Sequence, residues 1–598
     1  MTHLKNIMSK SSCFFCIMKE QDSPIRKSKI QDYLKGIPFL DNEQLILVVS
    51  ELWSLAMTRP DDEELLSLGL FQSMTILMNK AIHDRSWLLK HQNIYIPYYA
   101  AHIVGSYTMK RAYSAARAVD SGVVQPLLGL LRGEMSWVEQ RVAVRALGHL
   151  ASYEKTFEAV AVYEEEVVEL AMNLAVSCLE KVYKEFVGVK DGRGRVRYHC
   201  NLLTRGEGGV EMEGRKAEEW ASQLQCWSIH LLNCFAVKER CLHLICKREF
   251  LEKLCGVWGG LANHASPGGV GLIRILCHTR VGRESISRSK NVIESLCNVS
   301  RSSDEWQYMG IDCLLLLLKD VDSRHSVIES AALCLVDLVE LRILGNRRSL
   351  GDSITRTLLH EYKKPKIKNG DINVQRSLEM IWLLKVERKR REKLMSRERI
   401  EERRVMVKLI KQQGNHHFLV GNVGEAISKY SEALEICPLK HRNERMIVYS
   451  KRANCHLFLR DGDAAISDAT CALCLSSPPN SHGISLWIRA QAYDMKGMAK
   501  ESLMDCIVFM NVCISSGGGS GGRVLYYVVR MIYKQMEKTW LFREARIKVK
   551  EEVGIQEKKC KNYGSGLSTI MEEPYVVRDG IGIKKIERVI SGISNKTV

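Results

Sequence analysis

The chain has little of several features that mark familiar protein classes. Of its 598 residues, 11 are proline, and aromatic residues make up 7%. The longest leucine run, residues 314–318, is far shorter than the roughly 18 apolar residues that a membrane-spanning helix needs. Residues 1–21 lack the long apolar stretch and small-residue cleavage site of an export signal. We therefore expect no membrane insertion and a cytoplasmic protein, with the nucleus as an alternative location.

The 20 cysteines do not form a metal-binding pattern. Cys13-x-x-Cys16 has the spacing of half a zinc site or of a redox pair. Zinc takes four ligands, however, and His3, Cys200 and Cys226 add no second closely spaced pair. In a protein that is not exported, scattered cysteines behave as small buried hydrophobes. We expect no disulfide, no metal and no cofactor.

The motifs of common enzyme classes are missing from the sequence. Residues 517–522, Gly-Gly-Gly-Ser-Gly-Gly, do not form a phosphate loop, because no Lys-Ser/Thr follows and no strand is predicted before them. No Gly-x-Ser-x-Gly elbow, paired-histidine metal helix or kinase motif set occurs. We expect a protein that is not an enzyme.

Composition indicates a large globular protein built from helices. Hydrophobic residues (46%) and charged residues (26%) are in the usual range, and leucine- and alanine-rich helical periods predict an all-α fold. The length exceeds what one core can fill, so we expect about two to four domains or one long solenoid. The net charge of +18 is compatible with acidic peptides, nucleic acid or membrane surfaces, and does not choose among them.

The clearest unit of the N-terminal part is residues 121–151. Gly122 precedes a short leucine-rich helix, and a second helix follows after a polar turn with valine, leucine and closely packing alanines. This unit resembles an armadillo repeat, and residues 241–262, 292–319 and 326–344 are weaker echoes of it. The resemblance implies an α-solenoid of armadillo-like repeats, whose units bury their apolar faces against neighbours.

We divide the N-terminal part by its composition. Residues 1–38 are polar and basic and are predicted to be poorly ordered, and the armadillo-like solenoid is predicted over residues 39–385. Residues 187–216, rich in Gly, Arg and Glu, are predicted to be a loop insertion within it. Residues 386–405 alternate Arg and Lys with Glu and are predicted to form a charged helical spacer. The basic cluster from Arg388 to Lys393 is also the candidate for a nuclear import signal or a nucleic-acid patch.

The C-terminal part carries the densest pattern of the chain. Residues 411–418, Lys-Gln-Gln-Gly-Asn-His-His-Phe, are followed by small residues where two helices would touch and by large ones that would fill the wedge between them. This is the pattern of a tetratricopeptide repeat, a helix–turn–helix unit that binds peptides. Two further units begin near Tyr449 and Trp487. We predict a tetratricopeptide domain with a capping helix over residues 406–550 and a flexible tail over residues 551–598.

The first of these units resembles the carboxylate clamp of chaperone-binding tetratricopeptide domains. In that family five residues hold the C-terminal carboxylate of a Glu-Glu-Val-Asp peptide: a Lys and an Asn from the first unit, an Asn from the second unit, and a Lys and an Arg from the third. Lys411 and Asn415 match the clamp. Lys451 stands where the second unit of the family has asparagine, and the third unit has Ile484 and Ile488 in place of its cations, with Arg489 beside them. The resemblance implies that the peptide-binding residues are Lys411, Asn415, Phe418, Lys451 and Arg489.

The whole chain resembles plant proteins that join an N-terminal armadillo-like solenoid to a C-terminal tetratricopeptide domain. Myosin chaperones of the UCS kind contain the same two modules in the opposite order. These resemblances imply a non-enzymatic adaptor or co-chaperone that binds a heat-shock chaperone tail with one module and a client with the other. One alternative is a nuclear or nucleic-acid-associated scaffold that uses the basic surface, although no nucleic-acid-binding motif occurs. The other is a ubiquitin-ligase-like armadillo protein, for which no U-box signature is present.

Overall fold

The fold is that of an all-α solenoid, as the sequence predicts. The structure is a computed structural model that describes residues 13–189, 194–205, 207–257, 268–303, 306–321, 323–362, 372–516 and 525–560. Within these ranges helices follow one another, and the exception is a hairpin of two-residue strands, β1 (Ile343–Leu344) and β2 (Arg347–Arg348). In the described parts of the chain, no helix combines the length and the apolar character that crossing a bilayer requires.

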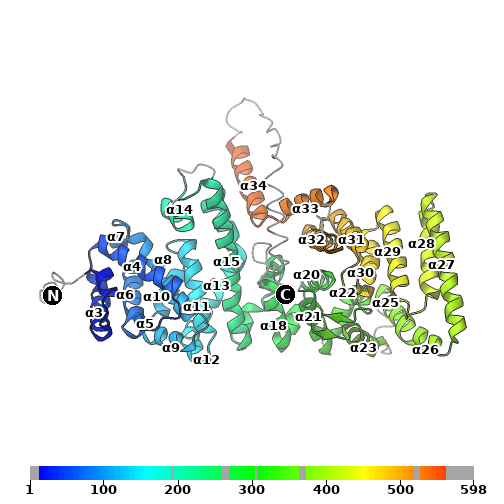
Figure 1. The fold of residues 1–598 in the computed structure, drawn as a ribbon, viewed down its shortest axis with the longest axis horizontal. Coiled ribbons are helices and arrows are strands. Elements are labelled where there is room, and N and C mark those ends of the chain that lie inside the picture. The colour runs from blue at the N-terminus through cyan, green and yellow to red at the C-terminus, as the bar shows by residue number, and fades with distance from the viewer. Residues whose placement is uncertain are drawn as a thin grey trace. The chain divides into compact units, whose positions relative to one another are not determined.

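The chain forms two compact units (Figure 1). Unit 1 comprises residues 1–282 with residues 544–549, and unit 2 comprises residues 283–543 with residues 550–598. The helices of unit 1 are α2 (Phe14–Met18), α3 (Ser23–Gly36), α4 (Asn42–Thr58), α5 (Glu64–Ser67), α6 (Leu70–His83), α7 (Arg85–Leu88), α8 (Ile96–Thr108), α9 (Ala112–Asp120), α10 (Val124–Leu131), α11 (Trp137–Ala151), α12 (Glu154–Ala161), α13 (Glu164–Val182), α14 (Arg197–Thr204), α15 (Val210–Val237), α16 (Leu242–Ile245), α17 (Arg248–Leu254) and α18 (Gly268–His278).

The helices of unit 1 begin and pack as their sequences dictate. The side chain of Asp41 caps α4 by accepting hydrogen bonds from the backbone N–H groups of Glu43 and Gln44, which have no partner inside the helix. The apolar stripe of α4 (Leu45, Val48, Val49 and Leu52) is buried, and the leucines of α10 and the alanines of α11 lie in the core. Gly105 of α8 faces Ala146 of α11, and a Cβ at Gly105 would make an ordinary contact of 3.6 Å with the Cβ of Ala146.

Two stretches that were predicted to be irregular are helical. Residues 13–36 contain α2 and α3, because Ile30 and Leu34 are buried and the carbonyl of Leu34 accepts a hydrogen bond from Ser73; residues 1–12 lie outside the described residues. The expected loop 187–216 contains α14 and the first turns of α15. Their composition is polar, but buried pairing supplies the stability that an apolar stripe would otherwise give. Arg195 forms an ion pair with Glu213 at 2.9 Å and its guanidinium lies over the ring of Phe186.

Unit 2 joins further helical repeats to an array of three helical hairpins. Helix α19 (Arg280–Ser287) spans the division between the units. Then follow α20 (Lys290–Arg301), α21 (Gln307–Lys319), α22 (Arg324–Asp337), β1, β2, α23 (Leu350–Tyr362), α25 (Ile372–Trp382), the π-helical turn η6 (Leu383–Glu387) and α26 (Arg388–Lys393). The hairpin array consists of α27 (Arg397–Leu419) with α28 (Val423–Ile436), α29 (Arg442–Phe458) with α30 (Gly462–Leu475), and α31 (Gly483–Met495) with α32 (Ala499–Ser516).

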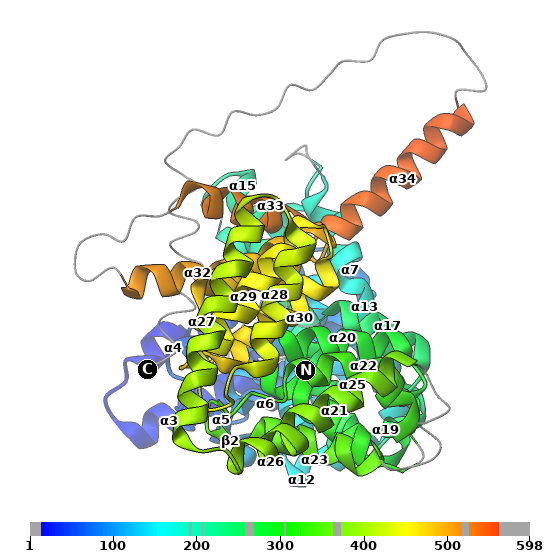
Figure 2. The same cartoon turned by 90° about the vertical axis from the view of Figure 1, so that its right-hand side faces the viewer.

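The hairpins stack in order, and further helices extend the array. Helices α27, α28, α29 and α30 lie side by side in two perpendicular views (Figures 1 and 2). Helix α33 (Tyr526–Lys538) packs on α32, where a capping helix was predicted. Helix α34 (Arg543–Cys560) runs through residues 551–560, which the sequence assigned to a flexible tail. The glycine-rich residues 517–522 and the rest of the tail from 561 lie outside the described residues.

The division of the chain falls elsewhere than at the charged segment. The sequence places a spacer at residues 386–405, whereas the boundary between the two compact units falls in the chain between Gly282 and Arg283. The reason is a set of buried polar contacts that tie α20–α22 to the hairpin array inside unit 2. The carboxylate of Asp337, for example, pairs with Arg301 at 2.6 Å and accepts a hydrogen bond from Ser467 at 2.5 Å.

Candidate functional site

The first hairpin of the array is held together by a close contact that its glycine makes possible. A Cβ on Gly414 would lie 2.7 Å from Cε1 of Tyr430, so any larger residue would displace that ring. Tyr430 is 2% exposed and donates a hydrogen bond of 2.8 Å to Oδ1 of Asn415. This bond orients the amide of Asn415, which is half-buried, and leaves its NH2 group without a partner in the described structure.

Two lysines of successive hairpins lie close to each other, and one of them, Lys411, is one helical turn from Asn415. Lys411 belongs to α27 and Lys451 to α29, and both are half-buried. Burial, and then the positive charge of Lys411, lower the pKa of Lys451, so the two ammonium groups are close enough to repel each other. Neither ammonium has a carboxylate partner among the residues that the structure describes. Lys411, Asn415 and Lys451 therefore present donors and positive charge on one surface, which we call the hairpin groove.

The other residues of the expected clamp are placed differently. Phe418 is half-buried and packs on the core between the first two hairpins, with its ring centroid 6.2 Å from that of Phe458. In the third hairpin Ile484 is 63% exposed, whereas Ile488 is 4% exposed and packs on Ala453. The third hairpin thus offers apolar surface where the chaperone-binding family has cations.

Arg489 does not line the groove, which corrects the expectation from the sequence. Its side chain is fully buried, and its guanidinium forms a bidentate pair with Asp505 at 2.7 and 2.8 Å. The remaining nitrogen donors reach Thr470 at 3.1 Å and Ser303 at 2.6 Å. A cation whose donors are filled in this way binds the hairpin to its neighbours and is not available to a peptide.

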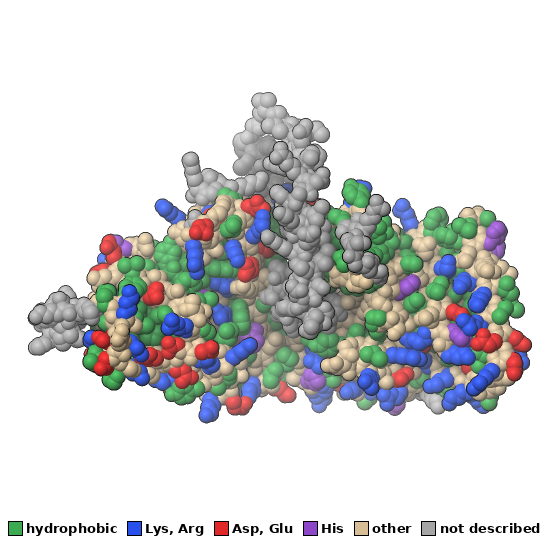
Figure 3. Space-filling view, viewed as in Figure 1, with side chains coloured by type: hydrophobic (Ala, Val, Ile, Leu, Met, Phe, Trp, Pro, Cys, Tyr) green, Lys and Arg blue, Asp and Glu red, His purple; other side chains and the backbone are tan. Residues whose placement is uncertain are grey.

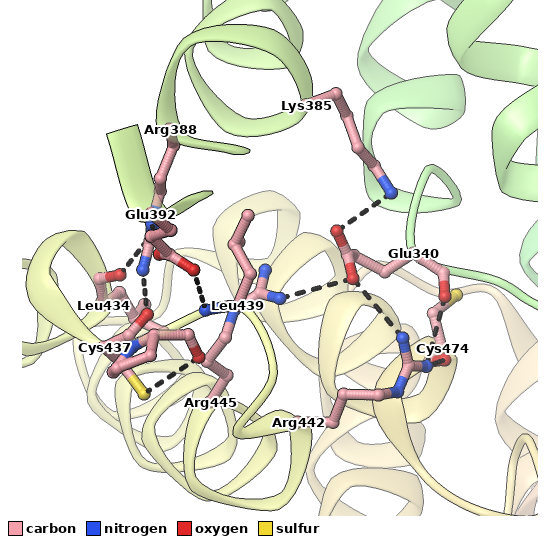
Figure 4. Close-up of polar contacts among 11 residues, drawn as sticks. Glu340, Lys385, Arg388, Glu392, Leu434, Cys437, Leu439, Arg442, Arg445 and Cys474 are labelled. Carbon is pink, nitrogen blue, oxygen red and sulfur yellow. Dashed lines mark hydrogen bonds and ion pairs between the residues drawn. The ribbon is translucent and has the colours of Figure 1, made fainter. Parts of the chain in front are cut away.

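A second group of charges, which the sequence did not reveal, sets the position of the middle hairpin (Figure 4). The carboxylate of Glu340, which follows α22, meets Lys385 at 3.0 Å, Arg445 at 3.3 Å and Arg442 at 3.5 Å. Burial raises the pKa of this carboxyl group, but Arg445 and Lys385 outweigh the burial and hold the pKa below its usual value. One half-buried carboxylate therefore joins three cations from η6 and the first turn of α29.

The basic segment is partly used for the same purpose. Arg388 of α26 donates to the backbone carbonyls of Leu434 and Cys437, and Glu392 accepts from the N–H of Leu439 at 2.9 Å (Figure 4). These contacts satisfy carbonyl groups at the C-terminal end of α28. The segment 388–393 is helical, as predicted, but it is docked on the first hairpin and is not a free spacer. No sequence signal marks these contacts, because Arg388 reaches carbonyl groups 46 residues or more away and the cations around Glu340 lie 45 residues or more away.

Within the described residues, no group of three or more His, Cys, Asp or Glu side chains lies close enough to hold a metal ion. The sulfur atoms of Cys13 and Cys16 lie 2.9 Å apart beside the buried ring of Phe14. The face drawn in Figure 3 carries Lys and Arg side chains with Asp and Glu among them, over both units.

Comparison with known families supports the armadillo-like part. Residues 5–247, less than half of the chain, match the model of the plant ARM repeat family. This stretch begins before α2, ends after α16, and includes the unit 121–151 that the sequence singled out. Armadillo-like repeats in the N-terminal part are thus supported, as predicted, over a range that begins and ends earlier than the predicted residues 39–385.

Individual relatives cover short parts of the chain. Protein unc-45 homolog B of Danio rerio is 28% identical over 96 residues, which is 16% of this chain and 10% of that protein. Sperm-associated antigen 1A of Danio rerio is 28% identical over 134 residues, which is 22% of this chain and 30% of that protein. The chain therefore spans less than a third of either relative. A crystal structure of an engineered protein aligns with 88% of this chain and 97% of its own, at 13% identity and a TM-score of 0.29, too low to carry an argument.

The matches and the fold agree on a general type of protein. A solenoid of helical repeats presents long surfaces to other proteins, and its stability comes from the stacking of neighbouring units. The protein is accordingly a helical-repeat scaffold with an armadillo-like N-terminal part.

Proposed function

We propose that the protein is a non-enzymatic adaptor whose C-terminal hairpins are tetratricopeptide repeats that bind the end of a peptide. The observation that carries this proposal is the hairpin groove, where Lys411, Lys451 and the free NH2 group of Asn415 face one surface and have no carboxylate partner among the described residues. A chain-terminal carboxylate in this position would form charge-assisted hydrogen bonds in a partly desolvated setting.

The groove differs from the clamp of the chaperone-binding family in a way that defines its ligand. Lys451 supplies the second cation from the middle hairpin, whereas the third hairpin supplies the exposed, apolar Ile484. We expect a peptide with a terminal carboxylate at the first two hairpins and an apolar side chain that reaches the third. The tail of a heat-shock chaperone, ending in Glu-Glu-Val-Asp, is one such ligand, and the armadillo-like repeats would hold a client.

Titration of the full chain with a Glu-Glu-Val-Asp peptide, followed by calorimetry, tests the proposal. Lys451→Glu replaces attraction by repulsion and should weaken binding about tenfold or more. Lys440→Glu makes the same charge change in an exposed turn and should leave binding as it is. A peptide with an amidated C-terminus lacks the terminal carboxylate. It should bind the wild-type protein as weakly as the unmodified peptide binds the Lys451→Glu variant. Absence of binding at millimolar peptide, or equal affinity of the two variants, would contradict the proposal.

The alternative of a nuclear scaffold rests on the cations of α26 that the fold leaves free. Lys389, Arg390, Arg391 and Lys393 are exposed, whereas Arg388 is used to dock the helix. A fluorescent fusion with Arg390 and Arg391 changed to glutamine would lose its nuclear signal if these residues direct import. An unchanged distribution would remove the basis of this alternative.

A further inference from the structure

Unit 1 contains a cavity that the hairpin groove does not involve. Its volume is about 790 Å³, and it is lined by side chains of α4, α8, α11, α14 and α15, which lie within one unit (Figure 1). Aromatic and basic residues alternate across its wall. The aromatic ones include Trp53 of α4, Tyr98 of α8, and Trp220 and Trp227 of α15.

The arginines of this cavity are held by aromatic rings and neutral groups. The guanidinium of Arg141 lies 3.7 Å from the ring centroid of Trp220, and it donates to Tyr98 at 3.2 Å and to Gln223 at 2.5 Å. Its Nε is buried and has no hydrogen-bond partner. Arg145 lies 5.8 Å from the ring centroid of Trp227, and one of its nitrogens is 3.4 Å from Nε2 of His102.

No carboxylate forms an ion pair with these arginines in the described structure. Burial lowers the pKa of Arg141 and the charge of Glu219 offsets part of this, but Glu219 forms its ion pair with Lys216, at 3.0 Å. The guanidinium of Arg205, the third arginine of the wall, lies 5.7 Å from the ring centroid of Trp53. Burial, and then the charges of Arg141 and Arg145, hold the pKa of His102 well below its usual value, so this ring is neutral at pH 7. The cavity is therefore strongly positive, and a buried positive charge without a partner is costly unless a ligand compensates it.

We propose that this cavity binds an acidic peptide segment, with a carboxylate or phosphate oxygen beside Arg141 and Arg145 and a neighbouring apolar side chain against Trp220 and Trp227. Guanidinium groups fixed on aromatic rings are pre-oriented to donate to oxyanions, and the rings supply apolar contact area next to them. The inference adds detail to the proposed function, in which the armadillo-like repeats hold a client. It rests on that proposal for one point, which is that the ligand is a protein.

A peptide fits this cavity better than a nucleic acid does. Binding to a nucleic-acid backbone uses many exposed cations along an extended track. Here Arg141 is 6% exposed, Arg145 is half-buried, and Lys216 is already paired. A short segment with one or two acidic groups matches the small number of enclosed cations.

Fluorescence anisotropy with the full chain tests the proposal. The probe is the fluorescein-labelled peptide Gly-Glu-Glu-Leu-Glu-Gly with both termini blocked, so that it offers no terminal carboxylate to the hairpin groove. Arg145→Gln should weaken binding about tenfold. Arg117→Gln, on α9 and outside the cavity wall, should bind as the wild type does. A peptide with phosphoserine in place of the first glutamate separates phosphate from carboxylate recognition.

The outcomes of these measurements are distinct. The inference is supported if the acidic peptide binds, the lysine analogue of the same peptide does not, and Arg145→Gln loses affinity. It is overturned if Arg145→Gln and Arg117→Gln bind alike, or if a hexathymidine oligonucleotide binds more tightly than either acidic peptide. Should Arg145→Gln unfold at a lower temperature than the wild type, Arg205→Gln, at an exposed arginine of the same wall, decides in its place. Lys451→Glu should leave this binding unchanged, which separates the inference from the hairpin groove.

Discussion

The buried and half-buried arginines of the two units are stabilised in different ways. In unit 2, Arg489 pairs with Asp505, Arg301 with Asp337 and Arg445 with Glu340. In the cavity of unit 1, Arg141 and Arg145 lie on tryptophan rings and have no carboxylate partner in the described structure. Unit 1 does contain paired arginines elsewhere, such as Arg195 with Glu213. The contrast is therefore between two kinds of site and not between two compositions.

The difference shows how charge can serve either structure or binding. A guanidinium that is fully paired with a carboxylate has its donors filled, and its role is to hold helices in register. A guanidinium stacked on a ring keeps its charge available, at the cost of desolvation in the unliganded protein. The same residue type thus marks a junction in unit 2 and a candidate binding site in unit 1.

The largest expected effect breaks the pairing in unit 2. Asp505→Ala leaves Arg489 buried without its carboxylate and should lower the free energy of unfolding of unit 2 by about 4 kcal/mol. Arg141→Met, in unit 1, removes a cation that has no such partner and should change stability by less than about 1 kcal/mol. Urea unfolding followed by circular dichroism measures both. Similar losses in the two variants would show that pairing does not distinguish the two sites.

A smaller effect is expected at the junction around Glu340. Glu340→Gln keeps the shape of the side chain but leaves Lys385, Arg442 and Arg445 without their shared anion, which should cost about 3 kcal/mol. Because the cations lower the pKa of Glu340 from its usual 4.5, its contribution is present above that pH and is lost as the pH falls through the lowered pKa. The wild type should lose this stability on acidification, and Glu340→Gln should lose less. An equal acid dependence of the two proteins would argue against the junction.

The smallest expected effect, at mildly acidic pH, comes from two histidines of unit 1. Burial lowers the pKa of His149 and of His199, both in unit 1, from 6.5 to about 4. At these two rings the unfolded chain binds protons below pH 6.5 that the folded unit does not, so their contribution to the stability of unit 1 is lost as the pH falls from about 6.5 to 4. Burial raises the pKa of Glu139, in the same unit, to about 7, and this carboxyl group offsets part of the loss. The loss is about 1 kcal/mol for each ring by about pH 5.5. Thermal unfolding across this range measures it, and His199→Gln should reduce the slope.

Much of the fold was readable from local patterns. Gly122 with the leucines after it indicated an armadillo-like unit, and the stretch from Lys411 to Phe418 predicted the first hairpin, since helical period and small residues at contacts are local properties. The segments around Ile30 and His199 were misassigned as irregular. The first segment is held by a hydrogen bond from Ser73 to Leu34, 39 residues apart, and the second by a contact between His199 and Ser136, 63 residues apart. No short window of sequence can show such partners.

The candidate site was predicted in part for the same reason. Lys411 and Asn415 are one turn apart on one helix, so the sequence places them on one face. Arg489 stands beside the expected position of a clamp cation, but whether its side chain turns outward or inward depends on Asp505, one helix further on, and on Ser303, 186 residues away.

By itself, the sequence determined that this protein is an all-α solenoid with an armadillo-like part and three C-terminal hairpins, because apolar periodicity and small contact residues act between near neighbours. Only the tertiary structure decided which charges are filled and which are free. Glu340, Asp505 and Trp220 are ordinary residues in the sequence. Each acquires its role from an arginine that folding brings to it, and the energy of a charge depends on what surrounds it in space.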